Sequence, residues 1–334
     1  MMDYLLAPLQ YEFFRNGLVA APLVGGICGL IGVYIVLRGM SYIGHGLSHA
    51  AFGGAVIGYV INVNFYIGAG LWGFLAALLI NQVVRRNKIG ADAAIGIVTT
   101  ASFAIGVALI SRVRRFTRNF EAALFGNILG VTSTDLFVIA GVGLMSLFVL
   151  FILYKQLLFT TFDKESAKVY GVPTEWVDTW FSLILAASII ASMQVIGVTM
   201  IAAAIVIPAI TARMLTDSFN KMVLLSTLLG TFTAISGMYL SFYFDAASGA
   251  TIVLFAAAIF CLVLFVDYLK KTWLSRVVLE EFPVMATHEH THEHEGTAHF
   301  HPHTSLEQMD HHRVEEPLQQ HSHEGHKHGG HSHG

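Results

Sequence analysis

Residues 16–37 read NGLVAAPLVGGICGLIGVYIVL, an uninterrupted stretch without any charged side chain. An α-helix needs about 20 apolar residues to cross the hydrocarbon core of a bilayer, so this stretch predicts a spanning helix. Similar runs follow along the chain, at 42–61, 66–84, 92–110, 136–154, 177–195, 196–214, 222–244 and 251–269. The sequence therefore predicts an all-α, polytopic membrane protein with about nine spans.

The composition supports a membrane domain followed by a different kind of tail. Hydrophobic residues make up 55% of the 334 residues and charged residues only 12%, whereas soluble domains average about 45–50% and about 25%. We divide the chain into a membrane domain, 1–276, and a tail, 277–334. The tail is rich in histidine and nearly lacks aliphatic residues, so we expect it to be disordered. No basic patch with interleaved aromatic residues suggests nucleic acid, and membrane lipid is the expected surrounding.

The orientation follows from the Lys and Arg residues in short loops, which favour the cytoplasmic side. Such residues follow the runs at 66–84, 136–154, 196–214 and 251–269, and nine spans would bring these loops to one side. We expect a multi-pass protein of the plasma or inner membrane, with the N-terminus outside and the tail in the cytoplasm. One loop departs from this pattern, because it would lie outside although it carries Arg112, Arg114, Arg115 and Arg118.

Two histidines lie within a predicted span, His45 and His49. Residues four apart share one face of a helix, and ionisable groups inside a membrane usually mark a pathway or a binding site. Neutral imidazole is a good ligand for zinc, but two ligands are too few for a tight tetrahedral site. A second copy of the chain across a two-fold axis would supply four. The alternative is that both side chains bond to neighbouring polar groups and only hold helices together.

The tail histidines are a second candidate for metal binding. They alternate with Glu, Gly, Ser and Thr, a composition typical of metal-binding tracts, although it is also found in solvated low-complexity segments. The six that we single out as possible ligands are His288, His290, His292, His294, His321 and His323.

The stretch 161–173, TFDKESAKVYGVP, is short and amphipathic, with Gly and Pro at its end. It cannot span a membrane, and it could either dock into a partner's groove or form an ordinary interfacial loop helix. The chain has no Walker A motif and no catalytic signature, so we expect no enzyme and no bound catalytic cofactor. ATP hydrolysis would need a separate subunit.

Three segments together resemble the metal-type permease family of ABC importers. They are RGMSYIGHGLSHA at 38–50, FGNILGV at 125–131, and DKESA at 163–167 combined with GVTMIAAAIVIPAITA at 197–212. The resemblance implies a fold similar to the cobalamin and siderophore permeases. It also implies a homodimer, a cytoplasmic ATPase dimer and an extracytoplasmic metal-binding protein. Asp163, Glu165, Ala167 and Gly171 would belong to the helix that couples the permease to the ATPase.

The same resemblance assigns the family's metal pair to His45 and His49. The family typically has Asp at the first of these positions, where this chain has His45. Manganese favours oxygen ligands and imidazole suits zinc, so the exchange favours transported Zn²⁺ over Mn²⁺ or Fe²⁺. We therefore predict the permease of a zinc importer. The alternatives are a manganese or iron ABC permease and a secondary carrier that needs no ATPase. A membrane metalloenzyme using Asp92 and an organic-chelate permease explain the residues less well.

Overall fold

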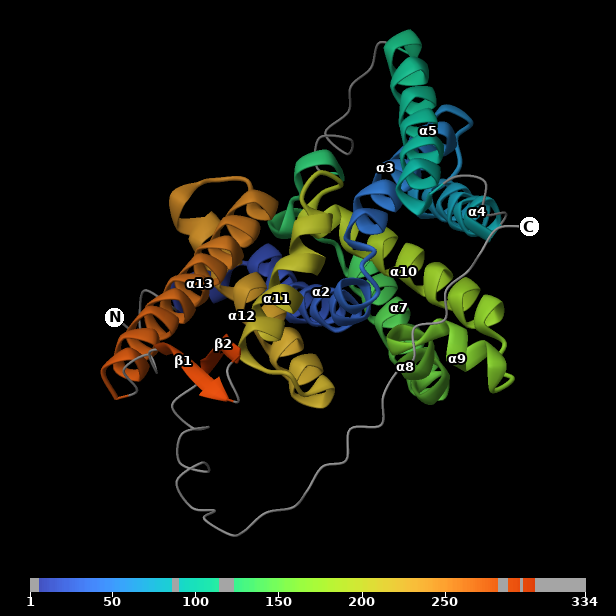
Figure 1. Cartoon of the computed structure of the whole chain (residues 1–334). Coiled ribbons are helices and arrows are strands. Elements are labelled where there is room, and N and C mark those ends of the chain that lie inside the picture. Colours follow the sequence, from blue (N-terminus) through green and yellow to red (C-terminus); the bar gives the residue numbers. More distant parts are fainter. Residues whose placement is uncertain (1–5, 86–89, 114–122, 282–287, 295–296, 304–334) are drawn as a thin grey trace, which may run out of the picture. The chain divides into compact units, whose positions relative to one another are not determined.

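The computed structural model describes residues 6–85, 90–113, 123–281, 288–294 and 297–303. The chain divides into two compact units, Met1–Val266 and Asp267–Gly334. The first unit is helical throughout its described part (Figure 1). The boundary that we expect at residue 276 stays a prediction.

Every predicted span coincides with a helix. These helices are α2 (Glu12–Leu37), α3 (Ser41–Val60), α4 (Phe65–Arg85), α5 (Ala91–Val113), α7 (Ser133–Ile152), α10 (Thr174–Ile196), α11 (Ile201–Leu215), α12 (Phe219–Phe244) and α13 (Ser248–Glu281). Short helices η1 (Ala7–Gln10), η2 (Ile128–Gly130), α8 (Tyr154–Phe162) and α9 (Lys164–Val169) complete the described helical part. The polytopic α-helical fold is thus confirmed.

The number of spans is smaller than nine by length and hydropathy. Seven of the described helices are long and apolar enough to cross a membrane, and α3 and α11 are not among them. Helix α11 has 15 residues and a length of roughly 22 Å, which is less than the hydrocarbon thickness of about 30 Å. Helix α3 carries both histidines and two serines, which lower its mean hydropathy. Nine is therefore an approximate count.

Close helix packing in the core depends on small residues. Gly25 and Gly29 of α2 lie against Gly230 and Ser226 of α12, where an added Cβ would collide with backbone carbonyls. The Ser226 hydroxyl donates to the carbonyl of Gly29 at 2.6 Å. Small residues and interhelical hydrogen bonds of this kind are typical of helix association in membranes.

The chain breaks between α10 and α11. Gly197 ends α10 with φ +90°, a conformation that glycine adopts without strain. The chain on both sides of Gly197 pairs with a distant loop, because the Val198 amide donates to the carbonyl of Ala123 at 2.8 Å and the Asn127 amide donates to that of Gln194 at 2.9 Å. The sixth and seventh runs, which adjoin in the sequence, are thus separated by a break in the helix between Ile196 and Ile201.

The second unit contains two short strands, β1 (His288–His294) and β2 (Thr297–His303), paired antiparallel. We expect disorder here, and for these residues the structure differs. The alternation of histidine with other residues has the period of a strand, which explains the pairing. His321 and His323, like the rest of 304–334, lie outside the described residues, as do Arg114, Arg115 and Arg118.

Candidate metal site

His45 and His49 lie side by side on α3. Their ring centroids are 4.4 Å apart and the rings stand at 75° to each other. His45 is exposed and His49 is half-buried. The structure thus places both predicted ligands one helical turn apart on a single face.

The pair lines a cavity of about 300 Å³ between α3 and α5. From α3 come Tyr42, His45, Gly46 and His49, and from α5 come Ile95, Gly96, Thr99, Thr100 and Phe103. The His49 ring meets the Phe103 ring edge to face, with centroids 4.7 Å apart. A mostly apolar cavity with a few convergent polar groups is the usual form of a small-ligand site.

Small residues on α3 bring α5 this close. A Cβ at Gly46 would meet the side chains of Ile95 and Thr99, and a Cβ at Gly53 would collide with the carbonyl of Ser102. The wall opposite the histidines therefore depends on glycine at these two positions. The sequence analysis missed Phe103 and Thr99, because nothing local in the sequence pairs α5 with α3.

Ser48 anchors the helix between the two histidines. Its side chain is fully buried, and its hydroxyl lies 2.8 Å from the carbonyl of His45 and 3.1 Å from that of Val198. Val198 belongs to the break between α10 and α11. The position of the pair is thus tied to the broken helix.

His49 has an unsatisfied nitrogen. Its Nδ1 is buried and has no hydrogen-bond partner among the described residues. A buried polar atom without a partner is unfavourable by about 1–3 kcal/mol, so an orphan at a cavity usually indicates a missing partner. This argues against the alternative that His49 only bonds to neighbouring groups.

In one copy, the described residues around His45 and His49 do not add a third His, Cys, Asp or Glu ligand. Within the part of the chain that the structure describes, no group of three or more His, Cys, Asp or Glu side chains could hold a metal. A metal at His45 and His49 needs further ligands from elsewhere. A second copy, as expected from the sequence, remains a prediction.

The predicted coupling residues lie in α9 or next to its ends. Asp163 caps this helix, because its carboxylate accepts from the Ser166 amide at 2.9 Å and from the Ser166 hydroxyl at 2.6 Å. Both hydrogen bonds lower the pKa of Asp163, and the one from the Ser166 hydroxyl has the larger effect. Ala167 is fully buried, Glu165 is exposed, and Gly171 has φ +79°.

Two residues of this segment were not singled out from the sequence. Val169 is 86% exposed and Tyr170 is 79% exposed, so both apolar side chains are open to a contact. Exposed apolar groups beside a polar rim often mark a contact with another protein. The feature is consistent with docking but does not test it.

The tail histidines occupy defined register positions where they are described. His288 pairs with His303, His290 with His301, and His292 with His299, while His294 pairs with Thr297. Directly opposed residues on antiparallel strands are close neighbours. The sequence analysis singled out His288, His290, His292 and His294 but missed their partners on β2.

Comparisons with known proteins agree with the resemblance. Residues 10–267 match the model of the ABC 3 transport family. The manganese transport system membrane protein MntC of Halalkalibacterium halodurans is 40% identical over 77% of this chain and 88% of the relative. A probable iron transport system membrane protein of Haemophilus influenzae is 35% identical over 79% of this chain and 97% of the relative.

A solved structure, PsaBC from Streptococcus pneumoniae in complex with Fab, aligns with a TM-score of 0.72 and 34% identity. The alignment covers 78% of this chain and 94% of the matched chain. Family, relatives and fold therefore agree along the membrane domain. The chain belongs to the ABC 3 transport family, as a multi-pass permease subunit of a metal transporter and not as an enzyme.

Proposed function

We propose that this chain is the permease of an ATP-driven importer of a divalent transition metal, with manganese or iron as cargo. The observation that carries the proposal is the His45–His49 pair, which lines a cavity and leaves Nδ1 of His49 without a partner. The names of the two relatives favour manganese and iron. They give no support to the zinc preference that we infer from His45.

Zinc remains the second candidate because of the ligand type. The nitrogen ligands at the cavity are the two imidazoles, Tyr42 adds a phenol, and none of the residues that line it is Asp or Glu. Manganese ordinarily prefers carboxylate and other oxygen ligands. A cavity with two imidazoles and threonine hydroxyls does not match that preference well.

The two-ligand site leads to the rest of the proposed assembly. Two copies facing each other would contribute His45 and His49 twice, enough for four-coordinate binding. A cytoplasmic ATPase dimer would contact the segment at 163–171, and an extracytoplasmic protein would deliver the ion. The N-terminus would lie outside and the tail in the cytoplasm.

Competition uptake tests the proposal. The chain is co-expressed with its ATPase and binding protein in cells that lack their own manganese, iron and zinc importers, and radioactive Mn²⁺ uptake is measured against excess Fe²⁺ or Zn²⁺. We expect His45→Ala with His49→Ala to abolish uptake at unchanged expression. Ile61→Ala, an exposed position just beyond α3, is the matched control.

The single variant His45→Asp separates the two cargo candidates. If the imidazole pair sets the preference, the carboxylate should shift competition from Zn²⁺ toward Mn²⁺. Unchanged selectivity would show that these two residues do not determine which metal is transported. Full uptake by the double alanine variant would refute the site.

A further inference from the structure

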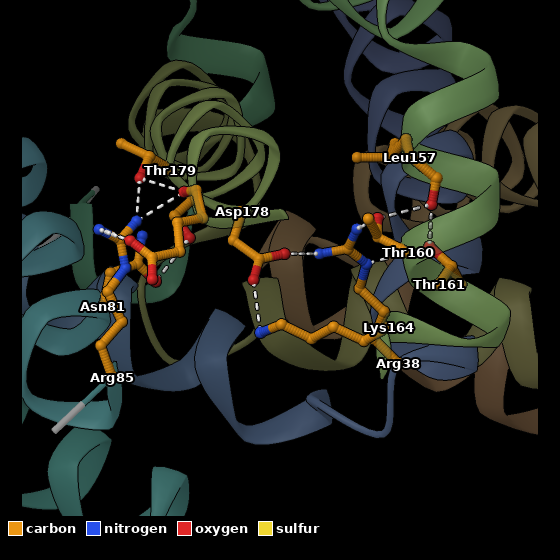
Figure 2. Close-up of polar contacts among 11 residues, drawn as sticks. Arg38, Asn81, Arg85, Leu157, Thr160, Thr161, Lys164, Asp178 and Thr179 are labelled. Carbon is orange, nitrogen blue, oxygen red and sulfur yellow. Dashed lines mark hydrogen bonds and ion pairs between the residues drawn. The ribbon is translucent and has the colours of Figure 1, made fainter. Parts of the chain in front are cut away.

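Arg38, at the junction between α2 and α3, has a buried side chain that makes several polar contacts. Its side chain is 7% exposed. Nη1 donates to Asp178 at 2.9 Å, Nη2 to the Thr160 hydroxyl at 2.8 Å, and Nε to the Thr161 hydroxyl at 3.0 Å (Figure 2). The guanidinium also lies over the Phe181 ring, 4.7 Å from its centroid. A cation this strongly held cannot move independently of its partners.

Asp178 on α10 connects Arg38 to the predicted coupling helix. One carboxylate oxygen accepts from Arg38, and the other lies 2.7 Å from the ammonium of Lys164. Lys164 is the first residue of α9. Figure 2 shows Asp178 lying between the two cations. One carboxylate thus joins the start of α9 to the end of α2.

The same junction leads directly to the histidines. Helix α3 begins at Ser41, three residues after Arg38. His45 follows four residues later, roughly 6 Å along the helix. Between the two helices Gly39 has φ +66°, and the turn is closed by hydrogen bonds from the Gly39 amide to the carbonyl of Val36 at 3.2 Å and from the Met40 amide to that of Ile35 at 3.0 Å. A displacement of Arg38 therefore acts on the start of the helix that carries the metal pair.

A second cavity gives this junction room to rearrange. It has a volume of about 380 Å³ and is lined in part by Arg38, Lys164, Asp178 and Ile43. Ile95 of α5 lines this cavity and also the one at His45 and His49. The ion-pair cluster and the candidate metal site thus share a wall.

We propose that Asp178 is a positioning residue that transmits the movement of the coupling helix to α3, through Lys164 on one side and Arg38 on the other. This inference rests on the proposed function, because it requires that the segment at 163–171 contacts the ATPase. Asp178 does not touch the metal. Its removal should leave metal binding intact and weaken the link between ATP hydrolysis and transport.

The test uses the complete transporter in proteoliposomes, with ATPase and binding protein, and measures Mn²⁺ transported per ATP hydrolysed. Asp178→Asn should lower this ratio at least about fivefold, within the range known for residues between coupled sites. Equilibrium Mn²⁺ binding should stay unchanged. Asp178→Glu should restore most of the ratio. Glu175→Gln is the matched control, because Glu175 lies one turn earlier on α10 in an exposed ion pair with Arg85.

A second pair of variants protects the test against misfolding. Lys164 is 61% exposed, so Lys164→Met should fold and should also lower the ratio. Lys155→Met replaces an exposed lysine of α8, outside the segment at 163–171, for which the described residues show no ion pair, and it should leave the ratio unchanged. An unchanged ratio in both Asp178→Asn and Lys164→Met overturns the inference. If Asp178→Asn does not assemble, equal ratios in Lys164→Met and Lys155→Met overturn it.

The proposed function and the role of Asp178 are refuted by different results. Absence of Mn²⁺, Fe²⁺ or Zn²⁺ transport by the unmodified chain would refute that function. Normal transport with unaffected variants would refute only the role of Asp178.

Discussion

The ion pairs among Arg38, Asp178 and Lys164 predict that replacing each residue lowers the stability of the chain by a different amount. Replacing Asp178 with Asn leaves the 7%-exposed Arg38 without its counter-ion. Removing one partner of a buried ion pair is destabilising by about 3–5 kcal/mol. We expect about 3 kcal/mol, the lower end of that range, because the Asn oxygen still accepts a hydrogen bond.

Replacing Arg38 with Met should be milder. Asp178 is 21% exposed and keeps its bond to Lys164. The Thr160 and Thr161 hydroxyls keep the carbonyl of Leu157 as an acceptor, at 3.1 and 2.6 Å. No partner is left buried without compensation, so we expect about 1–2 kcal/mol. Lys164→Met removes an exposed pair and should be destabilising by less than about 1 kcal/mol.

The assay is thermal unfolding of the purified chain in detergent. About 1 kcal/mol shifts the Tm of a chain of this size by roughly 2–4 °C. Asp178→Asn should therefore lower the Tm by roughly 6–12 °C, Arg38→Met by roughly 2–8 °C, and Lys164→Met by less than roughly 4 °C. A larger loss with Lys164→Met than with Asp178→Asn would refute the reasoning.

The remaining predictions concern three other parts of the chain. Gly53→Ala places a Cβ against the carbonyl of Ser102, so it should separate α5 from α3 and weaken Mn²⁺ binding. In the control Gly70→Ala the added Cβ meets open space and Mn²⁺ binding should not change; equal binding by the two variants would contradict the packing argument. Because the pKa of Asp163 is lowered in the folded chain, its cap stabilises α9 fully above the pKa of the unfolded chain and is lost as the pH falls through the lower folded value. Asp163→Ala should therefore remove the acid-dependent part of ATPase binding by the permease, and an unchanged pH profile of binding would argue against this. In the tail, four His→Ala substitutions on the strands should remove more bound Zn²⁺ from the full chain than four outside them. The strand set is His290, His292, His299 and His301, and the other set is His311, His312, His321 and His323. Equal losses of Zn²⁺ would show that the strand register has no role.

Local patterns in the sequence predict much of the fold. Long apolar runs coincide with helices because a membrane interior selects for them over a length that is fixed by bilayer thickness. The span count follows less directly from the sequence, since α11 is short and α3 includes His45, His49 and two serines. His45 and His49 could be found because a four-residue spacing places them together on one helix.

Contacts between distant segments could not be predicted in this way. Arg38 and Asp178 are separated by 140 positions, and neither lies in a pattern that indicates the other. Phe103 meets His49 only because glycines allow α5 to approach α3. The cargo stays a prediction, because general metal preferences of imidazole and carboxylate do not include the remaining ligands or the surrounding assembly.

The most direct measurement is pulsed electron paramagnetic resonance of Mn²⁺ bound to the purified transporter, with its histidines labelled with ¹⁵N. Couplings from histidine nitrogen should appear in the unmodified protein and persist when the tail histidines are replaced with alanine. They should disappear in His45→Ala with His49→Ala. Couplings that survive this double substitution would place the metal elsewhere and contradict the assignment.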